Sequence, residues 1–265
     1  MNFRAISFYL SLFCFPISFL SFINILYSTY FDYFLSVESY TLTLISSLSV
    51  GILFYFFGKN AFKKIVFFEQ LILIILVISL SSFFISLPYY FSNYQITFIN
   101  SLFEGFSGIT LTGFTIFDNI KYLDPTLIIW RSTSQWIGGL YFLFFLILIF
   151  SNKQFRYKLN DISLTSVETI NTEQNIKNII LKVFLIYLSL SILIFTLLAG
   201  SEIRLFNSLN LSMTIISTGG FLPTNNLSQI ITNKTQEISL IIAFFISCLN
   251  IFLLINIFDK KKIIK

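Results

Sequence analysis

Long apolar runs, separated by short polar segments, are the feature that most limits how this chain can fold. Several of them approach or reach the ~20 residues that a helix needs to cross the ~30 Å hydrocarbon layer of a bilayer. Of the 265 residues, 56% are hydrophobic and 11% are charged, whereas ordinary soluble domains have about 25% charged residues. The sequence therefore predicts a helical protein that crosses a membrane several times.

Six spanning helices and two shorter apolar stretches are predicted. The spanning helices are expected at residues 5–27, 36–58, 66–88, 125–150, 178–200 and 237–258. The shorter stretches, 98–109 and 205–216, would each form a helix of roughly 16–18 Å, which reaches halfway into the bilayer. Non-helical backbone at that depth is tolerated only where protein or water covers it. The predicted fold class is an all-α polytopic membrane protein with two re-entrant pore half-helices.

The positions of the basic residues predict the orientation. Thirteen of the 17 Lys and Arg residues fall on one side of this threading and four on the other. Cytoplasmic loops carry an excess of Lys and Arg. Both termini and the loops 58–64 and 151–177 are therefore expected in the cytoplasm. The four basic residues on the outer side are Lys121, Arg131, Arg204 and Lys234.

An internal repeat relates the two shorter stretches. The segments FINSLFEGFSGITLTGF, from Phe98, and LFNSLNLSMTIISTGGF, from Leu205, align without gaps at an offset of 107 residues. Each copy lies between two predicted spanning helices, so a unit of helix, pore loop and helix occurs twice. The predicted parts are an N-terminal helix pair (1–62), a first repeat (63–150), a cytoplasmic linker (151–177) and a second repeat (178–265).

The end of each copy has the residues expected of a cation filter. A filter replaces the hydration shell of an ion with inward-facing carbonyl oxygens. The unusual backbone this requires is accessible to glycine, and Thr or Ser hydroxyls bond the neighbouring backbone. Thr-Gly and Gly-Gly are also common in turns, but their recurrence after matching half-helices favours a filter. The predicted filter residues are Thr110, Leu111, Thr112, Gly113, Ser217, Thr218, Gly219 and Gly220.

Two charged residues near the first loop are predicted to support it. Arg131 lies six residues after Pro125, about 9 Å along that helix. Because an unpaired charge within the bilayer is costly, Arg131 is expected to pair with Glu104, the only acid in either half-helix, or with a loop carbonyl. For Glu104, pairing with Arg131 is favoured, and raising the local cation concentration is the alternative. A structural anchor is favoured for Arg131, and a role in ion permeation is the alternative. The pair Gly138 and Gly139 is expected to allow close helix packing.

Several classes of site are excluded or unsupported. The chain has no histidine, which excludes His-containing metal sites and Ser–His or Cys–His catalysis. Cys14 and Cys248 lie far apart in apolar stretches and predict no disulfide framework. Asp118, Asp124 and Glu202 form no recognisable catalytic constellation, so an enzyme is not expected. The net charge of +5 belongs to the loops and predicts no nucleic-acid partner.

The segment SLFEGFSGITLTGF, followed by DPTLIIWRSTSQWIGG, resembles the first pore domain of the Trk/Ktr/HKT potassium-transporter superfamily, of the TrkH type. The segment TIISTGGF resembles the second. The resemblance covers residues 66–258, and more loosely the first two helices. It implies K+ as the transported ion, no cofactor, and a filter to which each of four loops contributes a central glycine. Gly113 would be the first, and Gly220 is preferred over Gly219 as the second.

The resemblance also implies partners and a location. A TrkA-like cytoplasmic nucleotide-binding subunit would dock on the cytoplasmic face, including loop 151–177, and the setting would be the inner (plasma) membrane of a bacterium. The family has four pore domains and this sequence carries two. Because half a pore would leave an open wall facing lipid, we do not expect the chain to conduct alone. A separate second half or a truncation is favoured over a homodimer of halves; a non-conducting scaffold subunit is the alternative function.

Overall fold

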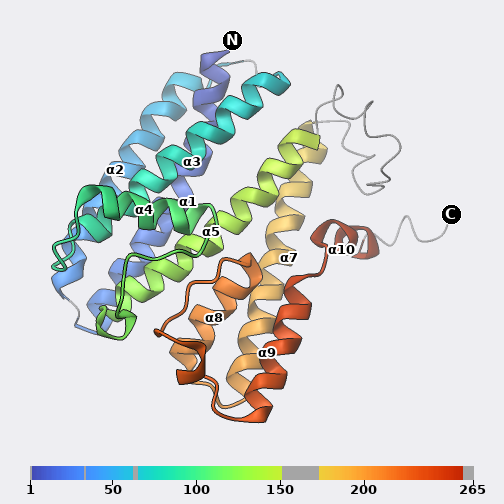
Figure 1. Cartoon of the computed structure of the whole chain (residues 1–265). Helices are drawn as coiled ribbons and strands as arrows, with labels where there is room; N and C mark the ends of the chain where they lie inside the picture. The colour runs from blue at the N-terminus through green and yellow to red at the C-terminus, as the bar shows by residue number, and fades with distance from the viewer. Residues whose placement is uncertain (1, 33, 62–64, 151–172, 259–265) are drawn as a thin grey trace.

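The computed structural model describes residues 2–32, 34–61, 65–150 and 173–258, and its regular structure there is helical (Figure 1). Within these residues, five helices are long and apolar enough to cross a membrane, which confirms the first five predicted spans. These are α1 (Phe3–Tyr30), α2 (Phe34–Gly58), α3 (Phe67–Tyr90), α5 (Pro125–Phe150) and α7 (Glu173–Gly200). The shorter helices are α4 (Phe98–Ile109), α8 (Leu205–Ser217), α9 (Lys234–Ser247) and α10 (Ile251–Phe258).

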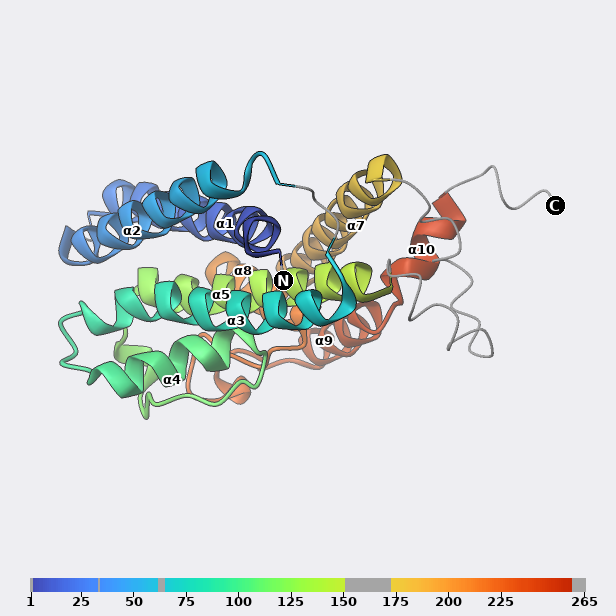
Figure 2. The same cartoon turned by 90° about the horizontal axis from the view of Figure 1, so that it is seen from above.

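The helices form two groups that share α5. Helices α1 to α4 pack together on one side of α5, and α7 to α9 pack on the other (Figures 1 and 2). Trp130 and Tyr141 of α5 belong to the core of the first group, whereas Leu140 and Ile147 belong to that of the second. Because α5 is apolar on both of these faces, it joins the two groups into one body.

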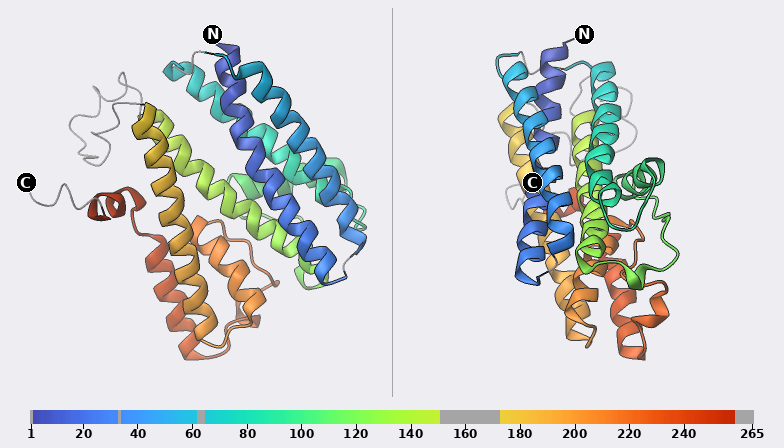
Figure 3. Two further views of the ribbon diagram at one scale, coloured as in Figure 1. Left: turned by 180° about the vertical axis from the view of Figure 1, so that it is seen from behind. Right: turned by 90° about the vertical axis from the view of Figure 1, so that its left-hand side faces the viewer.

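The helix ends form two sets, one at each end of the bundle. The start of α1, the end of α2, the start of α3, and the ends of α5 and α7 that flank residues 151–172 lie at the top of Figure 1. The turns after α1, α3 and α7 lie at the opposite end, as the views from behind and from the side also show (Figure 3). The long helices therefore alternate in direction, as the predicted threading requires.

The sixth predicted helix, 237–258, differs from the structure. It is two helices, α9 and α10, separated at Cys248–Asn250, and α10 turns across the direction of α9 (Figure 1). The Asn250 side-chain oxygen accepts a hydrogen bond from the Phe252 N–H at 2.9 Å. A short polar side chain that bonds nearby backbone favours a new helix start over continuation of the old helix.

Two predicted boundaries also change. Helix α3 continues through Pro88 to Tyr90. Proline removes only its own backbone donor, and beyond it the Phe91 N–H still donates to Leu87 O at 2.9 Å. Helix α7 begins at Glu173, inside the predicted linker 151–177. The rest of that linker, Lys63, Lys64 and the basic run at 260–265 lie outside the described residues.

The two short helices have the predicted positions. Helix α4 has the predicted bounds and α8 ends one residue later than predicted. Helix α5 approaches the C-terminal end of each through its adjacent glycines. A Cβ on Gly138 would lie 2.5 Å from Ile109 O, and one on Gly139 would lie 2.9 Å from Ser217 Cβ. This confirms the expected close packing and brings the ends of both short helices against adjacent residues of α5.

The contact at Gly138 yields a prediction for stability. In Gly138→Ala, the added methyl would overlap the Ile109 backbone, and overpacking of this kind costs about 1–3 kcal/mol. We expect a lower melting temperature in detergent. Gly200→Ala is the matched control because no atom lies within 4 Å of its added Cβ. Equal melting temperatures for the two variants would contradict the packing described here.

Candidate functional site

The segments that follow α4 and α8 fold in the same way. Each closes its helix with two backbone hydrogen bonds, and the bonds of the second copy lie 107 residues after those of the first. In the first copy, Leu111 N donates to Gly108 O at 3.3 Å and Thr112 N donates to Ser107 O at 3.2 Å. In the second copy, Thr218 N donates to Ile215 O at 3.0 Å and Gly219 N donates to Thr214 O at 2.9 Å. The repeat found in the sequence is therefore also a repeat in backbone structure.

Left-handed residues recur at matching places in these loops. The φ angles are +62° at Leu111 and +74° at Gly113, and +56° at Thr218 and +84° at Gly220. A left-handed conformation costs a residue with a Cβ roughly 1–2 kcal/mol, whereas glycine adopts it freely. In backbone conformation, Gly220 and not Gly219 is therefore the counterpart of Gly113.

The two loops meet at their glycines. A Cβ built on Gly113 would lie 2.5 Å from the carbonyl oxygen of Gly219, whereas one on Gly220 would have no atom within 4 Å. Among the residues the structure describes, none donates a hydrogen bond to the carbonyl oxygen of Gly113 or Gly220. Backbone carbonyls within a protein normally have a partner. Gly220 is exposed and Gly113 is partly exposed, so these carbonyl oxygens are candidates to bind a cation or water.

The ion pair predicted between Glu104 and Arg131 is present. Arg131 Nε lies 2.8 Å from Glu104 Oε1, and both side chains are buried, at 1% and 0% exposure. Glu104 also accepts hydrogen bonds from the Thr115 hydroxyl and the Ile116 N–H, each at 3.0 Å. The carboxylate thus anchors the outgoing backbone of the first loop. This geometry favours the structural role predicted for Arg131.

Helix α5 also holds the second loop. Arg131 donates to Leu222 O at 3.2 Å, and its guanidinium carbon lies 4.3 Å from the centre of the Phe221 ring. One helical turn later, the Gln135 side chain donates to Gly219 O at 2.7 Å and accepts from the Phe221 N–H at 3.0 Å. Charged and amide side chains on α5 therefore fix backbone that no helix or sheet would satisfy.

Sequence analysis assigned no role to Gln135 or Asn225. Gln135 follows Arg131 by four residues, so both lie on one face of a helix, and this spacing is a signal in the sequence. Asn225 accepts from the Ile120 N–H at 2.7 Å and donates to Asn119 Oδ1 at 2.9 Å, which joins the segment after α4 to the segment after α8. Such a long-range contact has no sequence signature.

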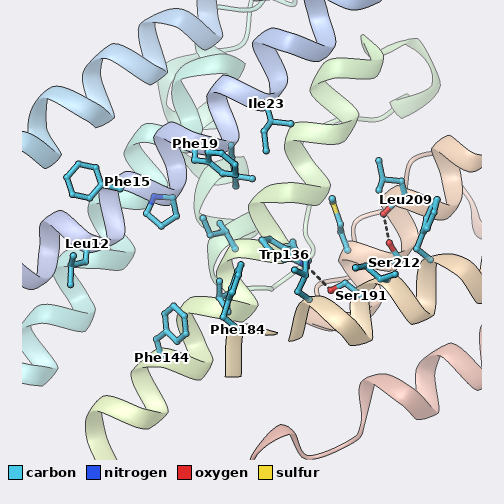
Figure 4. Close-up of a pocket in the computed structure, with 18 residues that line it drawn as sticks. Leu12, Phe15, Phe19, Ile23, Trp136, Phe144, Phe184, Ser191, Leu209 and Ser212 are labelled. Atoms are coloured by element: carbon cyan, nitrogen blue, oxygen red, sulfur yellow. Dashed lines mark hydrogen bonds between the residues drawn. The ribbon is translucent and has the colours of Figure 1, made fainter. Parts of the chain in front are cut away.

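The large apolar cavity lies apart from the paired loops. Its volume is about 850 Å³, and it is lined by residues of α1, α5, α7 and α8 (Figure 4). Among the described residues that line it, only Ser191 and Ser212 are polar, and the Ser191 hydroxyl already accepts from Trp136 Nε1 at 3.0 Å. A desolvated cation would find no charge and few free acceptors there. We therefore place the candidate site at the loops.

The buried ion pair yields a second prediction. In Glu104→Gln, the Arg131 guanidinium loses its carboxylate in a buried position, and breaking such a pair costs about 3–5 kcal/mol. The variant is expected to unfold at a markedly lower temperature in detergent. Glu237→Gln, the same change at an exposed position in the first turn of α9, should leave the melting temperature nearly unchanged. A similar small effect at Glu104 would contradict the anchoring role.

Comparison with known proteins places the chain beside potassium transporters. It is 28% identical, over 77% of its length and 45% of the relative's, to an uncharacterized cation transporter of Methanocaldococcus jannaschii. It is 47% identical over 49 residues (18% of the chain, 10% of the relative) to the Trk system potassium uptake protein TrkG of Escherichia coli. It is 42% identical over 59 residues (22% and 12%) to TrkI of Halomonas elongata. No family model matches.

The crystal structure of the potassium transporter TrkH from Vibrio parahaemolyticus has the same fold. The TM-score is 0.77 at 21% sequence identity, covering 96% of this chain and 51% of TrkH. The chain thus spans about half the length of TrkH and of the archaeal relative. Its homologues are Trk potassium uptake proteins and a cation transporter, which are transporters and not enzymes, and its own fold is that of TrkH.

Proposed function

We propose that this chain is a Trk-type subunit for potassium uptake, in which residues 110–113 and 217–220 form two quarters of an ion-selectivity filter. The observation that carries the proposal is the meeting of two loops with matching left-handed glycines, Gly113 and Gly220. Their undonated carbonyl oxygens supply the ligands that a dehydrated K+ ion requires. Gly220 is proposed as the second central glycine because its backbone matches that of Gly113.

We further propose that α4 and α8 are re-entrant and that α9 and α10 together form a sixth crossing. Helix α4 has 12 residues and α8 has 13, so at ~1.5 Å per residue they reach ~18–20 Å. Helix α9 alone, with 14 residues, extends ~21 Å and is too short for a ~30 Å layer. The partners that α5 supplies to both loops support placement of this backbone at membrane depth.

The proposed organisation keeps four parts, with cytoplasmic termini. These are a helix pair (1–62), a first repeat (63–150), a cytoplasmic linker and a second repeat that starts at the beginning of α7. Arg4 lies near the N-terminus and Lys59 follows α2, at the same end of the bundle (Figure 1). The positive-inside rule supports a cytoplasmic location for that end.

Two further pore segments are proposed to complete the filter. The basis is that the chain spans about half the length of TrkH and contains two pore loops. A TrkA-like nucleotide-binding subunit is proposed at the cytoplasmic face. A membrane potential of ~100 mV is worth about 2.3 kcal/mol per charge, which supports roughly fifty-fold accumulation of K+.

A non-conducting assembly subunit is the second candidate, and the number of loops favours it, since two segments do not enclose a pore. Flux of radioactive K+ analogues into liposomes separates the two functions. A conducting subunit gives flux when reconstituted with the products of neighbouring reading frames, and its glycine variants reduce that flux. A scaffold gives flux that is insensitive to those variants.

The filter glycines provide a prediction for transport. Gly113→Ser and Gly220→Ser each place a side chain on a left-handed backbone, so we expect loss of K+ uptake, or of its selectivity, in a transport-deficient bacterium expressing the gene in its native context. Gly200→Ser is the control because its Cβ would meet no atom and its φ is not positive. Unchanged selective uptake in either filter variant would refute the filter assignment.

The proposed orientation is tested with introduced cysteines. Lys59→Cys and Lys121→Cys are both at exposed positions and are made in a Cys248→Ser background, since Cys14 is buried. A membrane-impermeant maleimide should label Lys121→Cys on intact cells, and Lys59→Cys only after permeabilisation. The reverse labelling pattern would contradict the proposed orientation.

A further inference from the structure

Gln135 closes a bridge across Gly220. Its amide nitrogen donates to the carbonyl oxygen that precedes Gly220, and its amide oxygen accepts from the N–H that follows it. Because the backbone offers one acceptor and one donor, only one orientation of the amide makes both bonds. Gln135 is fully buried, so water does not compete with this bridge. The two bonds hold the second loop on both sides of its left-handed glycine.

The residue that precedes Gly220 must also be glycine for the Gln135 bridge to form. A Cβ on Gly219 would collide with the amide group of Gln135, so glycine at that position makes room for the side chain. The Gly219 carbonyl, already bonded to Gln135 at 2.7 Å, is a weaker ligand for a cation than the carbonyl of Gly220. The two adjacent glycines therefore have different tasks.

The first loop is held in another way. Glu104 of its own half-helix accepts hydrogen bonds from the Thr115 hydroxyl and the backbone N–H of Ile116. The position 107 residues after Glu104 is Leu211, so the second half-helix has no such carboxylate. Its loop depends on Arg131 and Gln135, which belong to the first repeat.

We propose that Gln135 is a positioning residue that sets which monovalent cations the filter admits. The inference rests on the proposed function and deepens it. Discrimination between K+ and Na+ depends on how many carbonyls surround the ion and how firmly they are held. A second loop without the bridge is free to close around the smaller Na+ ion. Gln135 thus acts on ion selection through Gly219 and Gly220 and does not touch the ion.

The test replaces Gln135 with a side chain of the same shape. In Gln135→Glu, the carboxylate still accepts from the Phe221 N–H. Its second oxygen is also an acceptor, however, so the hydrogen bond that Gln135 donates to Gly219 O is lost. The ratio of K+ to Na+ flux through the transporter, expressed in its native gene context and purified as the complex, is expected to fall about tenfold at neutral pH. Ser132→Ala is the matched control, because its buried hydroxyl bonds only Ile128 O of its own helix, at 3.3 Å.

A pH profile separates positioning from simple packing. A neutral carboxyl group has one donor and one acceptor, as an amide does, so the flux ratio of Gln135→Glu should recover as the pH is lowered. The charged groups on neighbouring elements are Arg131 of α5 and Glu104 of α4, which are already paired; the titratable Tyr187 of α7 donates to Trp136 O. The wild type and Ser132→Ala should show no such recovery.

Each outcome has a distinct meaning. A flux ratio of Gln135→Glu that equals the wild type at all pH values overturns the positioning role. A ratio that is low and independent of pH also overturns it, because the loss then comes from packing alone. If Gln135→Glu does not assemble, Gln135→Leu is measured instead, and an unchanged ratio there has the same consequence as in the first case. If Gly113→Ser and Gly220→Ser also leave selective K+ flux intact, the proposed function fails as well.

Discussion

Backbone that leaves a helix inside a bilayer must find its hydrogen-bond partners within the protein, and here many of them come from one helix. Arg131 and Gln135, one turn apart on α5, reach the second loop, and Arg131 orients the carboxylate that binds the first. The same helix packs against the ends of α4 and α8 through adjacent glycines. At the membrane depth that we propose for the loops, their non-helical backbone requires partners such as this polar face.

The charge of Arg131 on α5 is tolerated because it is paired and hydrogen-bonded. A lone arginine in the middle of a membrane is costly, but the Arg131 guanidinium has a carboxylate, a hydroxyl and a carbonyl around it. Two of these partners come from the first repeat and one from the second. Arg131 therefore also joins the two repeats, because it pairs with Glu104 of the first and donates to Leu222 O of the second.

The sequence predicted much of this architecture, for physical reasons that also explain its failures. Long apolar runs leave little choice in a bilayer, so five spans and both short helices were found near their observed bounds. The pairing of Glu104 with Arg131 followed from the cost of isolated buried charge. The break at Cys248–Asn250 was missed because a single asparagine decides it locally. The role of Gln135 depends on backbone 84 residues away, and no local pattern indicates such a partner.

The different surroundings of the two left-handed glycines have a consequence for how such a protein can diverge. Gly113 is constrained twice, by its φ angle and by the nearby Gly219 carbonyl, whereas Gly220 is constrained by its φ angle alone. Asparagine, which tolerates left-handed backbone better than other residues with a side chain, is therefore a permissible intermediate at the second position and not at the first. Mutational drift in the proposed filter should begin at the second loop.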